Sequence, residues 1–348
     1  METIIKKRIP KTTPSRAALV GNPSDGFHGG TIAIPVRNWG ATVTLEHDPE
    51  KKGIHFILNE RNDKHSFDSL DEFVKTTKKE GFYGGIRLLK ATLKQFYEYC
   101  QEKNIKLHDD QFSLEYTTNI PKLVGLAGSS AIITSCLESL IEFYDVERSQ
   151  LPLPIQANLV LNTELEQLKI KAGLQDRVVQ VYNEPVYMDF SKKAFNKNDG
   201  LHGEYQVIPK ELLPNFFIVY STESEESERV HTNLHFRYYE EKEPELIEAM
   251  KEFAWYTEQA KVSLEKKDHE RFSRIMDLNF DLRKQIIGED KIGKKNLEMV
   301  EIARASNACA NFSGSGGAIV GVYKDEDHFN KLEKEFHING YRLVKVKI

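Results

Sequence analysis

Apolar side chains recur at helical spacing in the stretch that follows residue 131. The apolar residues at positions 132, 133, 136, 137, 140 and 141 fall on one face when this stretch is helical. Shortly before it, residues 112–117 are typical of a strand. The pattern therefore predicts a strand, a loop and then a helix over 132–143 with one buried face.

Similar patterns predict most of the remaining elements. β-branched residues predict strands over 31–36 and 41–45, on either side of Trp39 and Gly40. A helix is predicted after Gly84-Gly85, and its apolar face carries Ile86, Leu89, Leu93, Phe96 and Cys100. The other predicted elements are helices near 155–168, from 174, near 244–265, 267–287, 296–306 and 325–337, and strands near 186–190, 216–220, 318–323 and 341–348. Strands and helices that alternate without a regular βαβ repeat predict an α+β fold.

Two halves are visible in the polarity of the chain. Residues 191–203 are polar and rich in lysine, which indicates a surface excursion between the halves. We therefore place a first domain at 1–200 and a second at 201–348. Residues 223–228 are acidic and predict a solvated loop.

The composition is that of a globular protein. Of the 348 residues 40% are hydrophobic and 29% are charged, which argues against a disordered chain. The net charge of −5, with Lys and Arg scattered, provides no basic surface for nucleic acid. No apolar run is long enough to span a membrane, and the N-terminal residues lack the apolar part of a signal peptide. We therefore expect a cytoplasmic protein with small-molecule partners and neither a nucleic acid nor a membrane as partner; the sequence does not define its oligomeric state.

The three cysteines do not suggest a disulfide framework or a metal site. Cys100, Cys136 and Cys309 cannot all pair, and no two of them have the spacing of metal ligands. Cys100 and Cys136 fall on apolar helical faces. We expect buried thiols in a reducing compartment.

The loop before the 132–143 helix has the composition of a phosphate site. From Pro121 to Ala131 it reads Pro-Lys-Leu-Val-Gly-Leu-Ala-Gly-Ser-Ser-Ala. Glycines and serines at this point leave backbone N–H groups free at the positive end of the helix dipole, where a phosphate binds. A simple turn with a serine cap has the same composition. The P-loop is excluded because no Gly-Lys-Ser/Thr follows the first glycine at the required spacing.

Two further motifs accompany this loop. Residues 14–25 read Pro-Ser-Arg-Ala-Ala-Leu-Val-Gly-Asn-Pro-Ser-Asp, and residues 311–318 read Asn-Phe-Ser-Gly-Ser-Gly-Gly-Ala. In this order and at this spacing, the three motifs resemble those of the GHMP kinases, which include galactokinase and the homoserine, mevalonate and phosphomevalonate kinases. The galactokinase branch has Pro-Gly-Arg-Val-Asn-Leu-Ile-Gly-Glu-His-Thr-Asp as its first motif, so Arg16, Gly21 and Asp25 match, whereas Asn22 and Pro23 replace Glu-His.

The resemblance implies a two-domain fold and a reaction. The N-terminal domain would be like the second domain of ribosomal protein S5, and the C-terminal domain would be ferredoxin-like. Segments 21–25, 84–89, 173–182 and 279–284 are similar to the glucuronokinase branch, which uses ATP to phosphorylate the anomeric hydroxyl of D-glucuronate and yields D-glucuronate 1-phosphate. Another sugar (galacturonate, arabinose or galactose) is the first alternative, and a catalytically silent sugar sensor is the second.

The same resemblance assigns residues to ATP and Mg²⁺. The nucleotide phosphates would lie on Gly125, Leu126, Ala127, Gly128, Ser129 and Ser130. Ser130 would also contribute its hydroxyl to Mg²⁺, together with a carboxylate that lies about a dozen residues before the catalytic aspartate. Glu164 and Glu166 are 12 and 10 residues before Asp176 and cannot both face one metal. The spacing favours Glu164.

The remaining assignments concern the sugar. Asp176 corresponds to the family's catalytic aspartate and Arg16 to a partner of the transferring phosphate, although a carboxylate at a helix N-terminus is often only a cap. Asn22, Asp25, Gly314 and Gly316 would lie beside the substrate. Arg177 and Arg283 are candidates for binding the C6 carboxylate of glucuronate, and either could equally form a surface ion pair. Trp39 could pack on the adenine or belong to the core.

Overall fold

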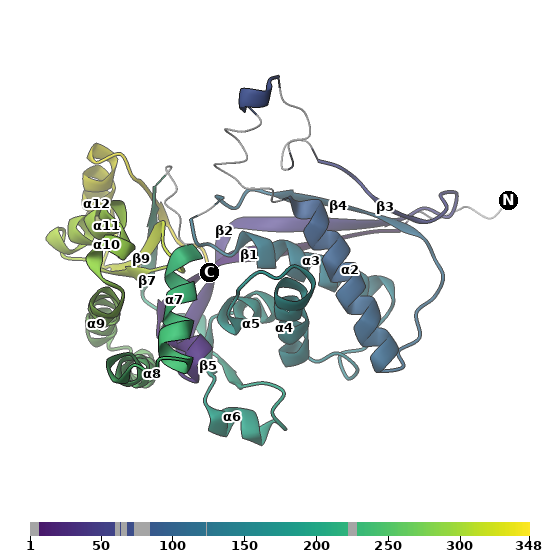
Figure 1. Ribbon diagram of the computed structural model, residues 1–348. Coiled ribbons are helices and arrows are strands. Elements are labelled where there is room, and N and C mark those ends of the chain that lie inside the picture. The colour runs from purple at the N-terminus through teal and green to yellow at the C-terminus, as the bar shows by residue number, and fades with distance from the viewer. Residues whose placement is uncertain (1–6, 60–62, 64–67, 73–83, 123, 222–227) are drawn as a thin grey trace. The chain divides into compact units, whose positions relative to one another are not determined.

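The computed structural model describes residues 7–59, 63, 68–72, 84–122, 124–221 and 228–348 (Figure 1). The chain divides into two compact units, one made of 1–13, 39–120 and 128–172, the other of 14–38, 121–127 and 173–348. The long strands β1 (Lys7–Val20) and β2 (Gly30–His47) are each divided between the two units. Neither unit is therefore a continuous stretch of sequence. The domain boundary expected at residue 200 stays a prediction.

The first unit contains a sheet centred on the second half of β2. Strand β4 (Phe112–Thr118) pairs antiparallel with it, and β3 (Ile54–Phe56) pairs parallel with β4. The two strands predicted on either side of Trp39 and Gly40 are one continuous strand. Gly40 marks a close approach of two strands, because a Cβ on it would lie 3.1 Å from the carbonyl oxygen of Thr13.

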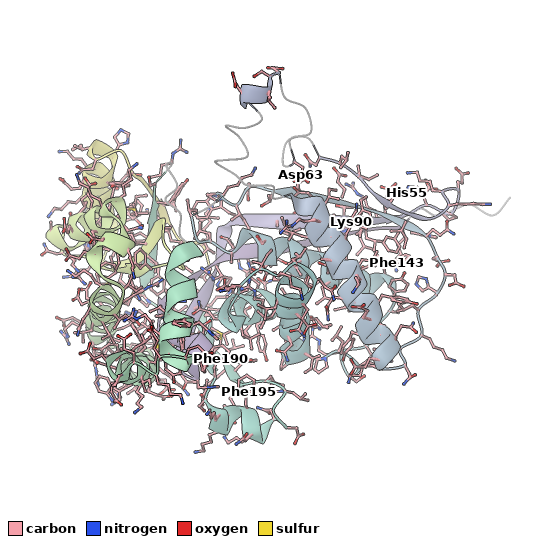
Figure 2. All side chains as sticks on the ribbon, viewed as in Figure 1. His55, Asp63, Lys90, Phe143, Phe190 and Phe195 are labelled. Atoms are coloured by element: carbon pink, nitrogen blue, oxygen red, sulfur yellow. The ribbon has the colours of Figure 1, made fainter. Side chains whose placement is uncertain are left out.

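Three helices of the first unit confirm the helices predicted for this region. They are α2 (Gly85–Glu102), α3 (Gly128–Phe143) and α4 (Leu153–Asn162), which continues into the π-helical turn η2 (Thr163–Gln167). Ser135 of α3 ties the helix to β2 by donating from its buried hydroxyl to the carbonyl of Ala41 at 2.9 Å. At the end of α3, Phe143 packs edge-on against Phe112 of β4, with ring centroids 5.1 Å apart (Figure 2). These contacts hold the middle and the end of α3 against the sheet, and the glycine and serine loop ends where α3 begins.

The second unit contains a four-stranded antiparallel sheet in the order β10-β7-β9-β8. Its strands are β7 (Asn215–Tyr220), β8 (Cys309–Phe312), β9 (Ala318–Tyr323) and β10 (Arg342–Lys345). Helices lie between β7 and β8 and between β9 and β10, so the chain follows a β-α-β-β-α-β path with the last strand beside the first. This is the ferredoxin-like arrangement.

Four helices that accompany this sheet confirm predicted ones: α8 (Pro244–Glu265), α9 (His269–Ile287), α11 (Lys294–Ala305) and α12 (Glu326–Ile338). Helices α7 (Glu228–Tyr239) and the short α10 (Glu289–Ile292) were not predicted. Buried aromatic rings join helices to strands: Phe272 of α9 lies edge-on to Phe216, with ring centroids 6.2 Å apart. Burying one such ring stabilises the fold by about 1.5–3 kcal/mol.

The rest of the second unit surrounds the first half of β2. Strand β5 (Val186–Asp189) pairs antiparallel with it, and β6 (Glu204–Val207) pairs with β5. Helix α5 (Leu174–Tyr182) begins where a short helix was predicted, and α6 (Lys192–Lys197) lies in the polar stretch 191–203, where Ser191 caps it. Two 3-10 turns, η1 (Ser24–Phe27) and η3 (Lys210–Leu212), complete the unit. The acidic loop predicted over 223–228 lies, apart from residue 228, outside the described residues.

The cysteines agree with the sequence analysis. All three are free and buried, as expected for Cys100 and Cys136 from their positions on apolar helical faces. Within the described ranges, no helix combines the length and the apolar character needed to cross a membrane.

Candidate active site

The candidate site is organised by an ion pair between Arg16 and Asp176. Arg16 lies in the fully buried part of β1, and Asp176 lies in the first turn of α5, 160 residues later. The arginine donates from Nε to Oδ1 at 2.5 Å and from Nη2 to Oδ2 at 2.8 Å. The pair is therefore bidentate, the geometry in which arginine binds a carboxylate most strongly.

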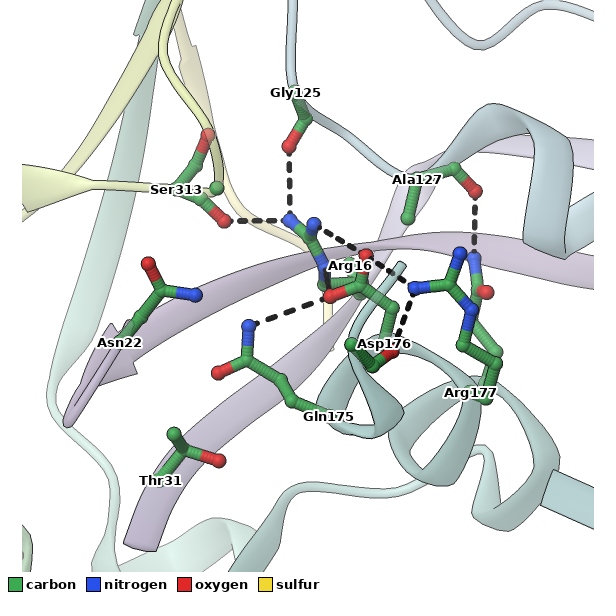
Figure 3. A network of polar contacts seen from close by, with 12 residues as sticks. Arg16, Asn22, Thr31, Gly125, Ala127, Gln175, Asp176, Arg177 and Ser313 are labelled. Atoms are coloured by element: carbon green, nitrogen blue, oxygen red, sulfur yellow. Dashed lines mark hydrogen bonds and ion pairs between the residues drawn. The ribbon is translucent and has the colours of Figure 1, made fainter. Parts of the chain in front are cut away.

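The other end of the same guanidinium holds two loops. Arg16 Nη1 donates to the carbonyl oxygen of Gly125 at 2.8 Å and to that of Ser313 at 2.6 Å (Figure 3). Gly125 belongs to the glycine and serine loop, and Ser313 follows β8 in the third motif. One buried side chain thus joins β1, α5 and two of the sequence motifs.

Glycine is required where the two motifs meet. A Cβ on Gly314 would lie 2.3 Å from the carbonyl oxygen of Gly125 and 2.9 Å from Arg16 Nη1. Gly125 itself has φ +69°, and a Cβ there would lie 2.7 Å from the carbonyl oxygen of Gly316. The third motif therefore packs directly against the glycine and serine loop at Gly125, Gly314 and Gly316.

Asp176 has two further neighbours on its own helix. Arg177 Nη1 lies 3.1 Å from Oδ2 and also donates to the carbonyl of Gly173, and Gln175 Nε2 donates to Oδ1 at 3.3 Å. Burial alone would raise the pKa of Asp176. The guanidinium groups of Arg16 and Arg177 outweigh burial and lower this pKa to about 2. Asp176 is therefore a carboxylate at any physiological pH.

Asp25 is a second carboxylate with the opposite tendency. It lies half-buried in η1, beside Gly173, where a Cβ on the glycine would lie 2.3 Å from Asp25 Oδ2. Burial and the negative charge of Asp176 raise its pKa to about 6, against the smaller opposing effects of Arg16 and Arg177. The pKa values of these two carboxyl groups thus differ widely although the groups lie in one cluster, as is common in active sites.

Arg283 of α9 is buried at the edge of this cluster. Its Nη1 donates to Asn22 Oδ1 at 2.8 Å and to the carbonyl of Gly314 at 3.0 Å, and its guanidinium lies 4.7 Å from the ring centroid of Phe312. Its Nε has no hydrogen-bond partner among the described residues. Burial lowers the pKa of Arg283 to about 10, so it is protonated at neutral pH. Arg283 is 1% exposed and therefore not a surface ion pair, the alternative left open by the sequence.

The remaining predicted residues lie in the first unit. Ser129 and Ser130 are in the first turn of α3, which begins at Gly128, and Ser130 is buried. Glu164 is buried on η2, whereas Glu166 is exposed. No cluster of three His, Cys, Asp or Glu side chains able to hold a metal is found within the described segments. Trp39 is half-buried, and its contact with adenine stays a prediction.

Sequence reasoning missed two buried amides in this cluster. Gln175 is the partner of Asp176 described above, and Asn279 accepts from the Gly21 N–H at 2.7 Å and donates to the carbonyl of Asn22. A usable signal existed for Asn279, because it lies four residues before Arg283 and therefore on the same face of α9. For Gln175, only its position next to Asp176 could have drawn attention.

The raised pKa of Asp25 predicts a pH-dependent cost to stability. The folded state holds the Asp25 proton up to about pH 6, the unfolded state only to about pH 4, so this group favours folding at low pH and loses that contribution as the pH rises through this window. We expect Asp25→Asn to raise the free energy of unfolding by about 1–3 kcal/mol at pH 7.5 and by almost nothing at pH 4. Urea denaturation across this range measures the difference. Asp199→Asn, at an exposed position, serves as control, and a gain that is equal at both pH values would contradict the assignment.

Comparisons with known proteins agree with this geometry. Residues 87–184 match the GHMP kinases N terminal domain, and residues 260–342 match the GHMP kinases C terminal family. The chain is 40% identical over 338 residues to Glucuronokinase 1 of Arabidopsis thaliana, covering 96% of this chain and 90% of that protein. It is also 40% identical over 339 residues to Probable glucuronokinase 2 of the same plant, with the same coverage.

Solved structures share the fold at low sequence identity. The mevalonate kinase of Methanococcus jannaschii has a TM-score of 0.70 at 20% identity over 98% of both chains. The galactokinase of Lactococcus lactis, solved with galactose, has a TM-score of 0.65 at 14% identity over 98% of this chain and 94% of that one. Together with the motifs and the cluster around Arg16, these similarities show that the chain belongs to the GHMP kinases and has their two-domain α+β fold.

Proposed function

We propose that this protein is a glucuronokinase, which transfers the terminal phosphoryl group of ATP to the anomeric hydroxyl of D-glucuronate and releases D-glucuronate 1-phosphate and ADP. The observation that carries the proposal is the bidentate Arg16–Asp176 pair beside Arg283, a buried cation to which no carboxylate is hydrogen-bonded among the described residues. The 40% identity to a plant glucuronokinase supports the choice of sugar.

Asp176 would orient the attacking hydroxyl. A carboxylate with a pKa of about 2 is a weak base and does not remove a sugar proton before the reaction begins. Phosphoryl transfer passes through a loose transition state in most analyses, so the proton need leave only late. A fixed, ionised acceptor is sufficient for that role, and Arg16 provides both the fixation and the ionisation.

The phosphates of ATP would lie on the loop from Gly125 to Ser130. Backbone N–H groups at the start of α3 and the helix dipole suit an anion there. Mg²⁺, which neutralises charge on the phosphates, would be held by the Ser130 hydroxyl and Glu164, both buried in the same unit. One carboxylate and one hydroxyl fit an ion that takes its other ligands from phosphate and water.

Arg283 is the better of the two candidates for the C6 carboxylate. Arg177 already lies 3.1 Å from Asp176, so its charge is partly neutralised. Arg283 is hydrogen-bonded only to two neutral oxygens, and its Nε is buried without a partner among the described residues. A buried cation in this state gains most from an anionic ligand. Asn22, which holds Arg283, would thereby shape the substrate site without carrying a charge that repels glucuronate.

The proposal is tested by the release of ADP across a panel of sugars. Purified protein with ATP and Mg²⁺ should use D-glucuronate with a higher kcat/KM than D-galacturonate, L-arabinose, D-galactose or D-glucose. Isolation of the 1-phosphate identifies the acceptor hydroxyl. A preference for a neutral sugar would overturn the assignment to uronates while leaving the kinase fold intact.

Asp176→Asn should lower kcat on glucuronate by about 10²–10⁴-fold, the range for a positioned acid or base group. The amide keeps the size of the carboxylate but cannot accept the proton. ATP affinity, measured by calorimetry, should change little because the ATP phosphates are assigned to other residues. Turnover within a few fold of the wild type would make Asp176 a helix cap and structural partner of Arg16.

Glu164→Gln should raise the Mg²⁺ concentration needed for half-maximal rate, whereas Glu166→Gln should leave it unchanged. The reason is that Glu164 is buried on η2 and Glu166 is exposed. A Mg²⁺ titration at fixed ATP measures both variants, and Ser130→Ala should show a weaker shift in the same direction. If Glu166→Gln raised the required Mg²⁺ concentration and Glu164→Gln did not, Glu166 would be the metal ligand.

Arg283→Met should lower kcat/KM for glucuronate by about 10- to 150-fold and change that for glucose by less than about threefold. A hydrogen bond to a charged group contributes about 1.5–3 kcal/mol, which corresponds to that range. Methionine fills most of the space of the arginine, and circular dichroism checks folding. Arg177→Met is the matched comparison, and we expect it to affect both sugars equally. Equal losses on both sugars for Arg283→Met would assign Arg283 to folding or to phosphate.

A further inference from the structure

Gln175 has an acceptor atom that the protein does not use. The residue is 1% exposed, and its Oε1 has no hydrogen-bond partner among the described residues. Buried side-chain oxygens are nearly always paired with protein or ordered water, so such an atom requires an explanation. In Figure 3 the free oxygen points away from Asp176, toward the side on which Asn22 and Thr31 lie.

The orientation of this amide is set by chemistry. Asp176 is ionised, because its pKa is about 2, and it can therefore only accept hydrogen bonds. The amide nitrogen must face it, as it does at 3.3 Å from Oδ1. Turning the amide over would place its oxygen against a carboxylate. Gln175 consequently presents an acceptor, and the group that completes its bonding must be a donor.

We propose that Gln175 Oε1 accepts a hydrogen bond from the sugar hydroxyl next to the one that is phosphorylated. This inference rests on the proposed function, in which Asp176 faces the anomeric hydroxyl. Gln175 is covalently next to Asp176, and its Nε2 is bonded to that carboxylate, so the free oxygen of the same amide lies beside the place assigned to the reacting hydroxyl. The anomeric carbon has only one carbon neighbour that bears a hydroxyl in the ring, C2, because its other ring neighbour is the ring oxygen. The hydroxyl read by Gln175 is therefore the one on C2.

The other buried glutamine of α5 provides a contrast. Gln180 also has an unpaired Oε1 among the described residues, but its Nε2 donates to two backbone carbonyls, those of Pro14 and Ala127. It thus tethers β1 and the loop before α3, and among the described residues it has no hydrogen bond to Asp176. A substitution at Gln180 removes a buried amide of the same size from the same helix without touching the acceptor proposed to contact the sugar.

The test compares D-glucuronate with 2-deoxy-D-glucuronate. For the wild type, kcat/KM should be higher on glucuronate, because the deoxy sugar leaves Oε1 without a donor. In Gln175→Met this ratio should fall by about three- to tenfold, the value of one neutral hydrogen bond, since only glucuronate loses a partner. Gln180→Met should keep the wild-type ratio. Gln175→Leu serves as a second variant, and thermal denaturation confirms that each variant is folded.

Each outcome has a distinct meaning. A ratio that falls in Gln175→Met or Gln175→Leu and not in Gln180→Met supports the contact with C2. Equal losses in kcat on both sugars would restrict Gln175 to positioning Asp176 and overturn the inference. A variant that loses no activity on either sugar and keeps the wild-type ratio of kcat/KM values would also overturn it, because ordered water would then satisfy Oε1. No turnover of glucuronate by the wild type would overturn the proposed function, and this inference with it.

Discussion

The bidentate ion pair between Arg16 and Asp176 is the interaction on which the candidate site depends. Its two partners are 160 residues apart, and the same guanidinium also bonds the carbonyls of Gly125 and Ser313. Removing one member of such a pair leaves a buried charge uncompensated, which typically costs about 3–5 kcal/mol. The arginine therefore has two effects. It joins the segments that carry Asp176, Gly125 and Ser313, and it keeps the carboxylate of Asp176 ionised.

The different pKa values of the two carboxylates follow from their surroundings. Asp176 is bonded to Arg16 and stays ionised. Burial and the charge of Asp176 disfavour the ionised form of Asp25 and raise its pKa to about 6. Near neutral pH, the cluster thus contains one permanent acceptor and one group that can hold or release a proton. Two residues of the same type can take different chemical roles in one site when their environments give them different pKa values.

Much of the fold and part of the site could be predicted from the sequence. Helical periodicity located α8 and α9, because each buries one face. The apolar residues of α3 and β9 also located these elements, although α3 is buried all round from Ser130 to Leu137 and β9 over four successive residues. The periodicity was wrong at Gly40, where it predicts a break between two strands. Gly40 lies within the continuous strand β2, and its missing side chain lets the neighbouring strand β1 approach closely. Motif resemblance led to Arg16 and Asp176 but gave no sign that they bond to each other, since spacing along the chain carries no information about a contact 160 residues away. Arg177 and Arg283 were equal candidates for the same reason, and only their different partners separate them.

The charges in the cluster also bear on which sugar it suits. Among the described residues, three guanidinium groups (Arg16, Arg177 and Arg283) surround two carboxylates, one of which is partly protonated near neutral pH. Burial lowers the pKa of Arg283, and the nearby charge of Arg16 adds a smaller effect in the same direction. A neutral sugar would bring no negative charge of its own to this cluster. A uronate would place its carboxylate near Arg283, to which no carboxylate is hydrogen-bonded among the described residues, so the charges of the cluster favour an anionic acceptor.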